Sequence, residues 1–204
     1  NHLKIPGLNI TEIPVFDYRE TLMPDASNSE YAEWHKLHHR SERENDWGMW
    51  VHTFDDLIPP ERYFDTHPEY FSLNNGVRSS KTQLCLSNPN VLDLVILQLK
   101  ELIAENPRAT YWSVSQNDTY GPCECLGCKK LDNQYGGVPS GSLIHFVNQI
   151  AERFPTKIIS TLAYQYSRRA PAGIKPADNV NIVLCTIELN RSRPIKTDPG
   201  SRGF

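Results

Sequence analysis

Two carboxylates follow apolar, strand-like runs in this chain and could together perform acid–base chemistry. Asp118 comes after the run YWSVS, and Glu188 comes after the run NIVLC. One carboxyl group of such a pair can act as an acid while the other serves as a base, a nucleophile or an orienting group, provided that their surroundings drive their pKa values apart. We therefore predict that Asp118 and Glu188 are catalytic, in the manner of the carboxylate pairs that cleave glycosidic bonds.

Further polar side chains follow the other strand-like runs. In parallel α/β folds the carboxyl ends of the strands form one face, where sites are built. Most strands end in polar loop residues, and this explains part of the placement of these side chains. It does not explain why so many ionisable groups lie at the carboxyl ends of the strands. We predict that six residues at this face bind a polyol substrate: Arg19, Glu20, His52, Asn117, Tyr164 and Tyr166.

Three cysteines lie close together in the sequence CECLGC, at Cys123, Cys125 and Cys128. Zinc sites normally combine two separated Cys or His pairs, and the chain has no second C-x2-C, so a fourth ligand would come from elsewhere. The sequence offers His145, His52 or Cys85. A structural zinc site, a disulfide within the loop or to Cys85, and free thiols all remain open. On each reading the loop braces the segment that carries Asp118.

Cys85 and Cys185 stand alone in the apolar stretches QLCL and IVLC. We interpret both as buried small hydrophobic residues. No histidine that could act as a base lies near the three loop cysteines in sequence, which argues against a thiolate nucleophile. The chemistry is therefore expected at the carboxylates, with no cofactor required for it.

The elements that would position these residues alternate along the chain. Asn88 caps a helix that begins at Pro89 and carries apolar residues at helical spacing, and a second helix begins at Ser140 or Ser142. Strands are predicted over 111–115, 157–164 and 181–185, with shorter ones over 13–18 and 48–51. The stretch 29–46 could be helix or loop. This alternation predicts an α/β fold of parallel strands joined by crossover helices, in one domain spanning residues 1–204.

The composition restricts the class of protein. The chain of 204 residues carries a net charge of −3 without long runs of like charge, which argues against a general binder of nucleic acid or of anionic membranes, because such a protein needs a basic surface. No apolar stretch approaches the roughly 20 residues that span a bilayer. With 39% hydrophobic and 22% charged residues, the chain therefore reads as an ordinary globular protein rather than a disordered one.

Three segments in order, beginning "WGMWVHTFDDLIPPERYF", "WSVSQNDTYGPCECLGC" and "LAYQYSRRAP", resemble a bacterial family known as domain of unknown function 4838. The resemblance implies a TIM-barrel, glycoside-hydrolase-like protein, distantly similar to α-glucuronidases and β-N-acetylhexosaminidases, that is periplasmic, attached to the cell envelope or secreted by polysaccharide-degrading bacteria. In hexosaminidase-type barrels an acidic pair ends the fourth strand, and Asn117 and Asp118 stand at that place here. By the same analogy Asp118 is the acid, while Arg19 and His52 bind sugar.

A complete barrel takes about 250 residues and eight strands, whereas the sequence predicts about five. We therefore expect an incomplete TIM-barrel-like sheet. The leading hypothesis is a glycoside hydrolase acting on a poly- or oligosaccharide, and the alternative is a non-catalytic carbohydrate-binding module on a degenerate barrel. A metal-dependent hydrolase, with His52, Asp118 and the cysteines around one ion, is a third possibility.

Overall fold

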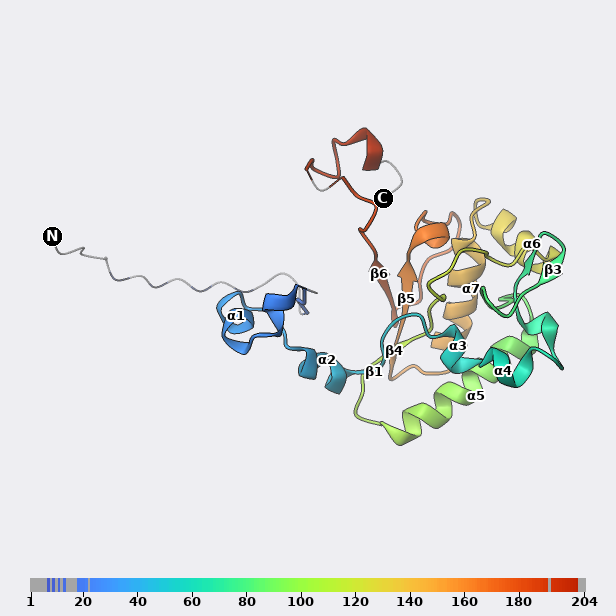
Figure 1. Ribbon diagram of the computed structural model, residues 1–204, viewed down its shortest axis with the longest axis horizontal. Helices are drawn as coiled ribbons and strands as arrows, with labels where there is room; N and C mark the ends of the chain where they lie inside the picture. Colours follow the sequence, from blue (N-terminus) through green and yellow to red (C-terminus); the bar gives the residue numbers. More distant parts are fainter. Residues whose placement is uncertain are drawn as a thin grey trace. The chain divides into compact units, whose positions relative to one another are not determined.

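The computed structural model describes residues 7, 9, 11, 13, 18–21, 23–190 and 192–201, without the side chains of residues 40 and 42. The chain divides into two compact units, Asn1–Glu44 and Asn45–Phe204 (Figure 1). Most of the strand predicted over 13–18 lies outside the described residues. The predicted catalytic residues and cysteines all belong to the second unit.

The stretch left open as helix or loop is largely helical. It contains α1 (Ser29–Trp34) and α2 (Arg40–Asp46), and the short helix η1 (Pro24–Ser27) precedes them. Asn28 caps α1, because its side chain accepts hydrogen bonds from the backbone N–H groups of Glu30 and Tyr31.

A four-stranded parallel sheet organises the second unit. Its strand order is β1-β4-β5-β6, with all neighbouring pairs parallel. The strands are β1 (Trp47–Met49), β4 (Tyr111–Ser113), β5 (Ile158–Ala163) and β6 (Val180–Leu184). Each agrees with a predicted strand to within a few residues, and the α/β class with parallel strands and crossover helices is confirmed.

The connections between these strands hold the helices. Between β1 and β4 lie α3 (Phe54–Leu57), α4 (Pro60–Tyr63), η2 (Pro68–Tyr70), the antiparallel hairpin of β2 (Leu73–Asn74) and β3 (Val77–Arg78), and α5 (Pro89–Glu105). Between β4 and β5 lie α6 (Leu126–Gln134) and α7 (Ser140–Ala151). The short helices η3 (Gln165–Ser167) and η4 (Pro199–Ser201) follow β5 and β6. No helix in the described ranges combines the length and apolar character that a membrane crossing requires.

Each parallel strand that follows along the chain adds to the same edge of the sheet. Connections between parallel strands are right-handed, so this strand order places all the connecting helices on one face of the sheet, as in a barrel. In a doubly wound sheet the strand order reverses partway, and helices cover both faces. α7 packs on β5 and β6, and α5 packs against α7 on the same side of the sheet (Figure 1). The described strands form an open sheet rather than a closed barrel, in agreement with the expected incomplete barrel.

The core lies between the sheet and these helices. Trp112, Val114 and Ile159 are buried against a stripe of α5 and against α7. Side chains alternate along a strand, and the intervening Ser113 and Ser115 hydrogen-bond to each other at 2.9 Å. The sheet thus presents an apolar side to the helices and a polar side opposite.

Gly48 allows β1 to approach this core closely. A Cβ atom at this position would lie 2.3 Å from the indole ring of Trp112. A glycine in a strand often marks such a close approach. The side chain of Trp112 therefore fills the space that any larger residue at position 48 would need.

The segment after β4 contains more regular secondary structure than the sequence predicted. The segment interpreted as one long loop contains α6, and Cys125 is its N-cap, with Sγ accepting a hydrogen bond from the N–H of Cys128 at 3.4 Å. The hairpin β2–β3 and the short helices α3 and α4 were also missed. Each of these elements has too few residues for a helical or strand periodicity to be recognised in the sequence.

Candidate functional site

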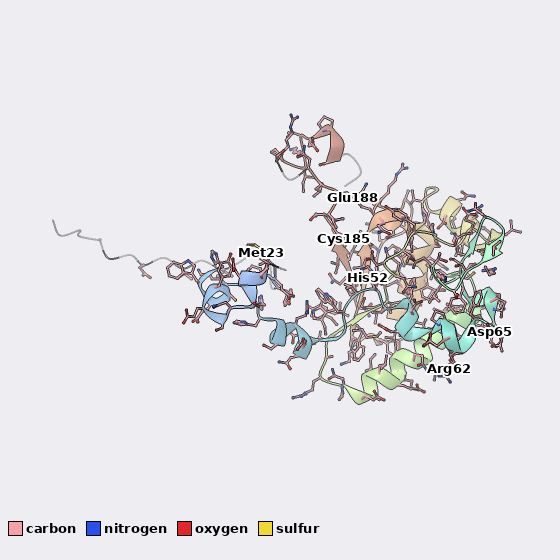
Figure 2. All side chains as sticks on the ribbon, in the orientation of Figure 1. Met23, His52, Arg62, Asp65, Cys185 and Glu188 are labelled. Atoms are coloured by element: carbon pink, nitrogen blue, oxygen red, sulfur yellow. The ribbon has the colours of Figure 1, made fainter. Side chains whose placement is uncertain are left out.

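The carboxyl ends of the four parallel strands carry the polar residues that the sequence singled out. His52 follows β1, Asp118 follows β4, Tyr164 follows β5 and Cys185 follows β6. Figure 2 marks His52 and Cys185 at this end of the sheet, with Glu188 further along the chain beyond β6. Hydrogen bonds, a ring contact and electrostatic interactions among these side chains define a candidate site, which we call the strand-end cluster: His52, Asp118, Tyr164, Gln165 and Cys185.

Asp118 is exposed and is held by a tyrosine. The phenol of Tyr164 donates a hydrogen bond to Asp118 Oδ1 at 2.7 Å, and the side-chain amide of Gln165 donates to the same phenol oxygen at 2.9 Å. The hydrogen bond to Asp118 raises the pKa of Tyr164, and partial burial adds to this effect. Tyr164 therefore stays protonated at neutral pH and keeps the Asp118 carboxyl group in a defined orientation.

His52 stands next to this pair, with its ring centroid 5.7 Å from that of Tyr164. Its Nδ1 lies 2.8 Å from the carbonyl oxygen of Gln116. A carbonyl oxygen can only accept, so in the neutral ring Nδ1 carries the proton and Nε2 keeps the lone pair. His52 can thus accept a hydrogen bond from a substrate hydroxyl.

The backbone at two of these positions adopts the left-handed region, with φ of 58° at His52 and 49° at Gln165. Residues other than glycine rarely occupy this region, and such conformations concentrate at functional sites. The backbone N–H of His52 donates to Ser115 Oγ at 2.9 Å, which anchors the unusual conformation to the end of β4.

Cys185 differs from its interpretation as a buried hydrophobic residue, because it is partly exposed and close to Asp118. Burial and the negative charge of Asp118 raise the pKa of the Cys185 thiol. It is therefore a neutral thiol at neutral pH and a poor nucleophile.

A buried network beneath the cluster positions the segment that carries Asp118. The side-chain amide of Gln83 donates to the carbonyl oxygens of Asn117 (3.0 Å) and Thr119 (2.7 Å), and Gln83 Oε1 accepts from the backbone N–H of Asn117 at 2.9 Å. Sequence reasoning missed Gln83, for which the only signal is one amide residue before an apolar stretch. Asn117, predicted to bind substrate, donates its own amide to Asp55 Oδ1 and to the carbonyl oxygen of Thr82. Both residues therefore brace the site from below.

Two other predicted residues have different neighbours. Glu188 forms an ion pair with Arg168. Burial raises the pKa of Tyr166, and electrostatic interactions with Asp132 and Cys128 of α6 raise it further. The structure therefore brings His52, Asp118 and Tyr164 together and leaves Tyr166 in a different environment.

Arg19 and Glu20 belong to the first unit, where their contacts are local. Arg19 Nε donates to the carbonyl oxygen of Lys36 at 2.9 Å, and Glu20 accepts from the phenol of Tyr18 and pairs with Arg43 at 3.1 Å. Their role in sugar binding stays a prediction.

The three loop cysteines form a second cluster, apart from the strand ends and together with Cys85. All five cysteines lie within the described residues, and none of them is joined in a disulfide. Hydrogen bonds from Cys123 and Cys128 lower the pKa of Cys85, whereas the same kind of contact with Cys123 and Cys85 raises the pKa of Cys128.

A cavity of about 690 Å³ lies beside the helix face of β5 and β6. Its lining is mostly aliphatic, including Leu143, Leu162 and Leu184. A sugar-binding site needs convergent polar groups, and these lie in the strand-end cluster instead.

The fold and the strand-end cluster define a parallel α/β protein, wound in the sense of a barrel, with titratable side chains at the face where such proteins bind ligands. The chain belongs to the family described as domain of unknown function DUF4838, which it matches over residues 1–202. This confirms the resemblance drawn from the sequence. No curated protein matches the chain.

Solved structures with detectable similarity include GH36 α-galactosidases from Geobacillus stearothermophilus. The α-galactosidase AgaB is 18% identical with a TM-score of 0.33, and the match covers 48% of this chain and 14% of that chain. A variant of the α-galactosidase AgaA in complex with stachyose is 19% identical with a TM-score of 0.30, over the same shares of both chains. Similarity at this level does not establish a common fold or a common activity.

Proposed function

We propose that the strand-end cluster binds a carbohydrate and that the protein is a glycoside hydrolase with Asp118 as a catalytic carboxylate. The observation that carries this proposal is the exposed Asp118 carboxyl group, oriented by the phenol of Tyr164 at 2.7 Å beside the His52 ring. Carboxylates at the carboxyl ends of parallel strands are the usual source of acid–base groups in barrel enzymes.

The roles follow from the hydrogen-bonding capacity of each group. A carboxylate has two oxygens, so Asp118 can accept the bond from Tyr164 and still contact a sugar hydroxyl or the glycosidic oxygen. His52 offers Nε2 as an acceptor for a further hydroxyl. Together they supply one proton-transferring group, Asp118, and one group that orients the sugar, His52.

Glu188 is the proposed second carboxylate. It follows β6 and pairs with Arg168, and a neighbouring cation suits a base, a nucleophile or an orienting group. An envelope or extracellular location, which the family resemblance implies, would give such an enzyme access to polysaccharide and forms part of the proposal.

The second candidate function is a carbohydrate-binding module without catalysis. It is favoured by the fact that both carboxylates already have partners, Tyr164 for Asp118 and Arg168 for Glu188. Groups held in this way recognise hydroxyls well without needing to transfer a proton.

Hydrolysis of a panel of aryl glycosides and uronides tests both functions. For an enzyme, we expect Asp118→Asn to lower kcat by about 10²–10⁴-fold, the usual contribution of a positioned acid or base, while sugar binding measured by calorimetry persists. Tyr164→Phe, which removes the donor to Asp118 and the acceptor for Gln165, should lower kcat less. Asp93→Asn, at an exposed position on α5, is the matched control and should leave turnover unchanged.

The other outcomes are equally specific. Sugar binding without turnover, weakened by Asp118→Asn, would support the binding module. Turnover that survives Asp118→Asn would show that Asp118 is not catalytic. Neither turnover nor binding in the wild type would remove both proposals.

A further inference from the structure

Four sulfur atoms from two distant parts of the sequence meet beside the hairpin β2–β3. The Sγ atoms of Cys85, Cys123, Cys125 and Cys128 all lie within 4.8 Å of one another. Cys85 precedes α5, Cys123 and Cys125 lie in the loop before α6, and Cys128 lies in the first turn of α6. Three of the four side chains are buried and Cys125 is half-buried.

The spacing of the sulfurs suits one tetrahedral metal ion. With Zn–S bonds of about 2.3 Å, tetrahedral geometry places the sulfurs about 3.8 Å apart. The sulfurs of Cys85 and Cys125 are 3.6 Å apart, whereas a disulfide would need about 2.05 Å. We propose that Cys85, Cys123, Cys125 and Cys128 bind a single structural zinc ion.

Hydrogen-bond donors surround the sulfurs as a zinc–thiolate site requires. The backbone N–H of Leu73 donates to Cys123 Sγ and that of Cys128 donates to Cys125 Sγ, both at 3.4 Å. The guanidinium of Arg78 lies 3.8 Å from Cys123 Sγ. Four thiolates and Zn²⁺ carry a net charge of −2, so these donors and the Arg78 cation stabilise the site in the way that outer-shell groups do elsewhere.

The ligand set indicates zinc rather than a harder cation or an iron–sulfur cluster. Thiolates are soft ligands, and four in a tetrahedron are typical of zinc or of iron. In an iron–sulfur cluster the cysteines bind different iron atoms and lie farther apart than ligands of one ion. Because all four positions are protein sulfurs, no position is open for water or substrate, and the role is structural.

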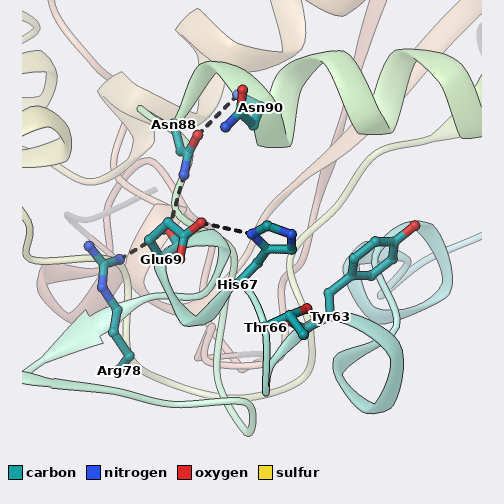
Figure 3. Close-up of polar contacts among 7 residues, drawn as sticks. All are labelled: Tyr63, Thr66, His67, Glu69, Arg78, Asn88 and Asn90. Carbon is teal, nitrogen blue, oxygen red and sulfur yellow. Dashed lines mark hydrogen bonds and ion pairs between the residues drawn. The ribbon is translucent and has the colours of Figure 1, made fainter.

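The position of the site explains what the ion would hold together. Beside the sulfurs, the carbonyl oxygen of Glu69 accepts hydrogen bonds from Arg78 (3.5 Å) and Asn88 (3.2 Å), which ties the hairpin to the start of α5 (Figure 3). The loop before α6 joins the hairpin through Glu124 N–H and the carbonyl oxygen of Leu73, at 2.8 Å. Zinc would join the segment before α5 to the start of α6, a few residues after Asp118, while the hairpin is held to both by these hydrogen bonds. Its binding would release the remaining thiol protons to solvent.

Metal analysis of the purified full chain tests the proposal without any assay of activity. We expect one zinc per chain in protein produced with zinc and freed of unbound metal by gel filtration. Cys85→Ser and Cys128→Ser should each lower the zinc content at least tenfold. Cys185→Ser, which removes the cysteine outside this group, is the matched control and should keep the full content.

A second measurement covers the case in which the serine variants do not fold. Wild-type protein exchanged into cobalt should show the intense visible absorption of a tetrahedral cobalt–thiolate site, and chelation should abolish it and lower the melting temperature. A wild-type chain with no zinc and no such cobalt spectrum, one iron in place of zinc, or loss of zinc in Cys185→Ser would each overturn the proposal. None of these results depends on whether the protein hydrolyses a sugar.

Discussion

Replacing Gln83 tests whether the buried network positions the end of β4. In Gln83→Ala the backbone N–H of Asn117 and the carbonyl oxygen of Thr119 lose their partner, while the carbonyl oxygen of Asn117 keeps the N–H of Thr119 at 2.7 Å. Each buried group left without a partner costs about 1–3 kcal/mol. We therefore expect a loss of about 2–5 kcal/mol in the free energy of unfolding, allowing for water that enters the space.

Gln83→Glu sharpens the test because it keeps the shape of the side chain. The acceptor for Asn117 N–H remains, but the donor that faces Thr119 becomes a carboxylate oxygen, so a charge is buried against carbonyl oxygens. The loss at neutral pH should be at least as large as for alanine. It should shrink at acid pH, where the protonated carboxyl group can donate again.

The assay is urea unfolding followed by far-UV circular dichroism and by the fluorescence of tryptophan, with Trp112 as the buried reporter in the core. Gln134→Ala, at an exposed position on α6, is the control and should stay within about 0.5 kcal/mol of the wild type. A loss below about 1 kcal/mol for Gln83→Ala, with an unchanged slope against urea, would refute the proposed role of the network.

Two further changes test the packing and the electrostatics of the second unit. Gly48→Ala should cost about 1–3 kcal/mol in urea unfolding, because its Cβ would lie 2.3 Å from the Trp112 ring and β1 must shift; an unchanged unfolding midpoint would contradict the packing. Burial raises the pKa of Asp132 above 3.8, although hydrogen bonds from Ser142 oppose the shift. The folded state therefore binds the Asp132 proton more tightly than the unfolded state does. As a result, this residue lowers the free energy of unfolding as the pH rises from about 3.8 through the raised pKa. Asp132→Asn should therefore gain stability relative to the wild type across that interval, whereas exposed Asp93→Asn should not, and equal pH profiles for both variants would disprove the assignment.

The helix α5 shows what local sequence can predict. Asn88 as the cap, Pro89 in the first turn and the stripe of Val91, Val95 and Leu99 all specify the same helix, and the structure confirms each of them. These signals lie within a few residues of one another, so they do not depend on the rest of the fold.

The hairpin and the contacts of the site show where local sequence fails. Leu73–Asn74 and Val77–Arg78 are too short to show alternation. Gln83 has no periodic partner, and its importance comes from the carbonyl oxygens of Asn117 and Thr119, which lie more than thirty residues away. Such contacts depend on how the loops pass one another.

The sequence by itself determined the parallel α/β class, its main helices and strands, the family, and the position of Asp118 at a strand end. Only the tertiary structure decided that Tyr164 orients Asp118, that Cys185 lies beside it, and that Cys85 completes the group of four sulfurs. The reason is physical: helix and strand periodicity reflects local burial, whereas the meeting of distant side chains depends on strand order and on the direction of each crossover.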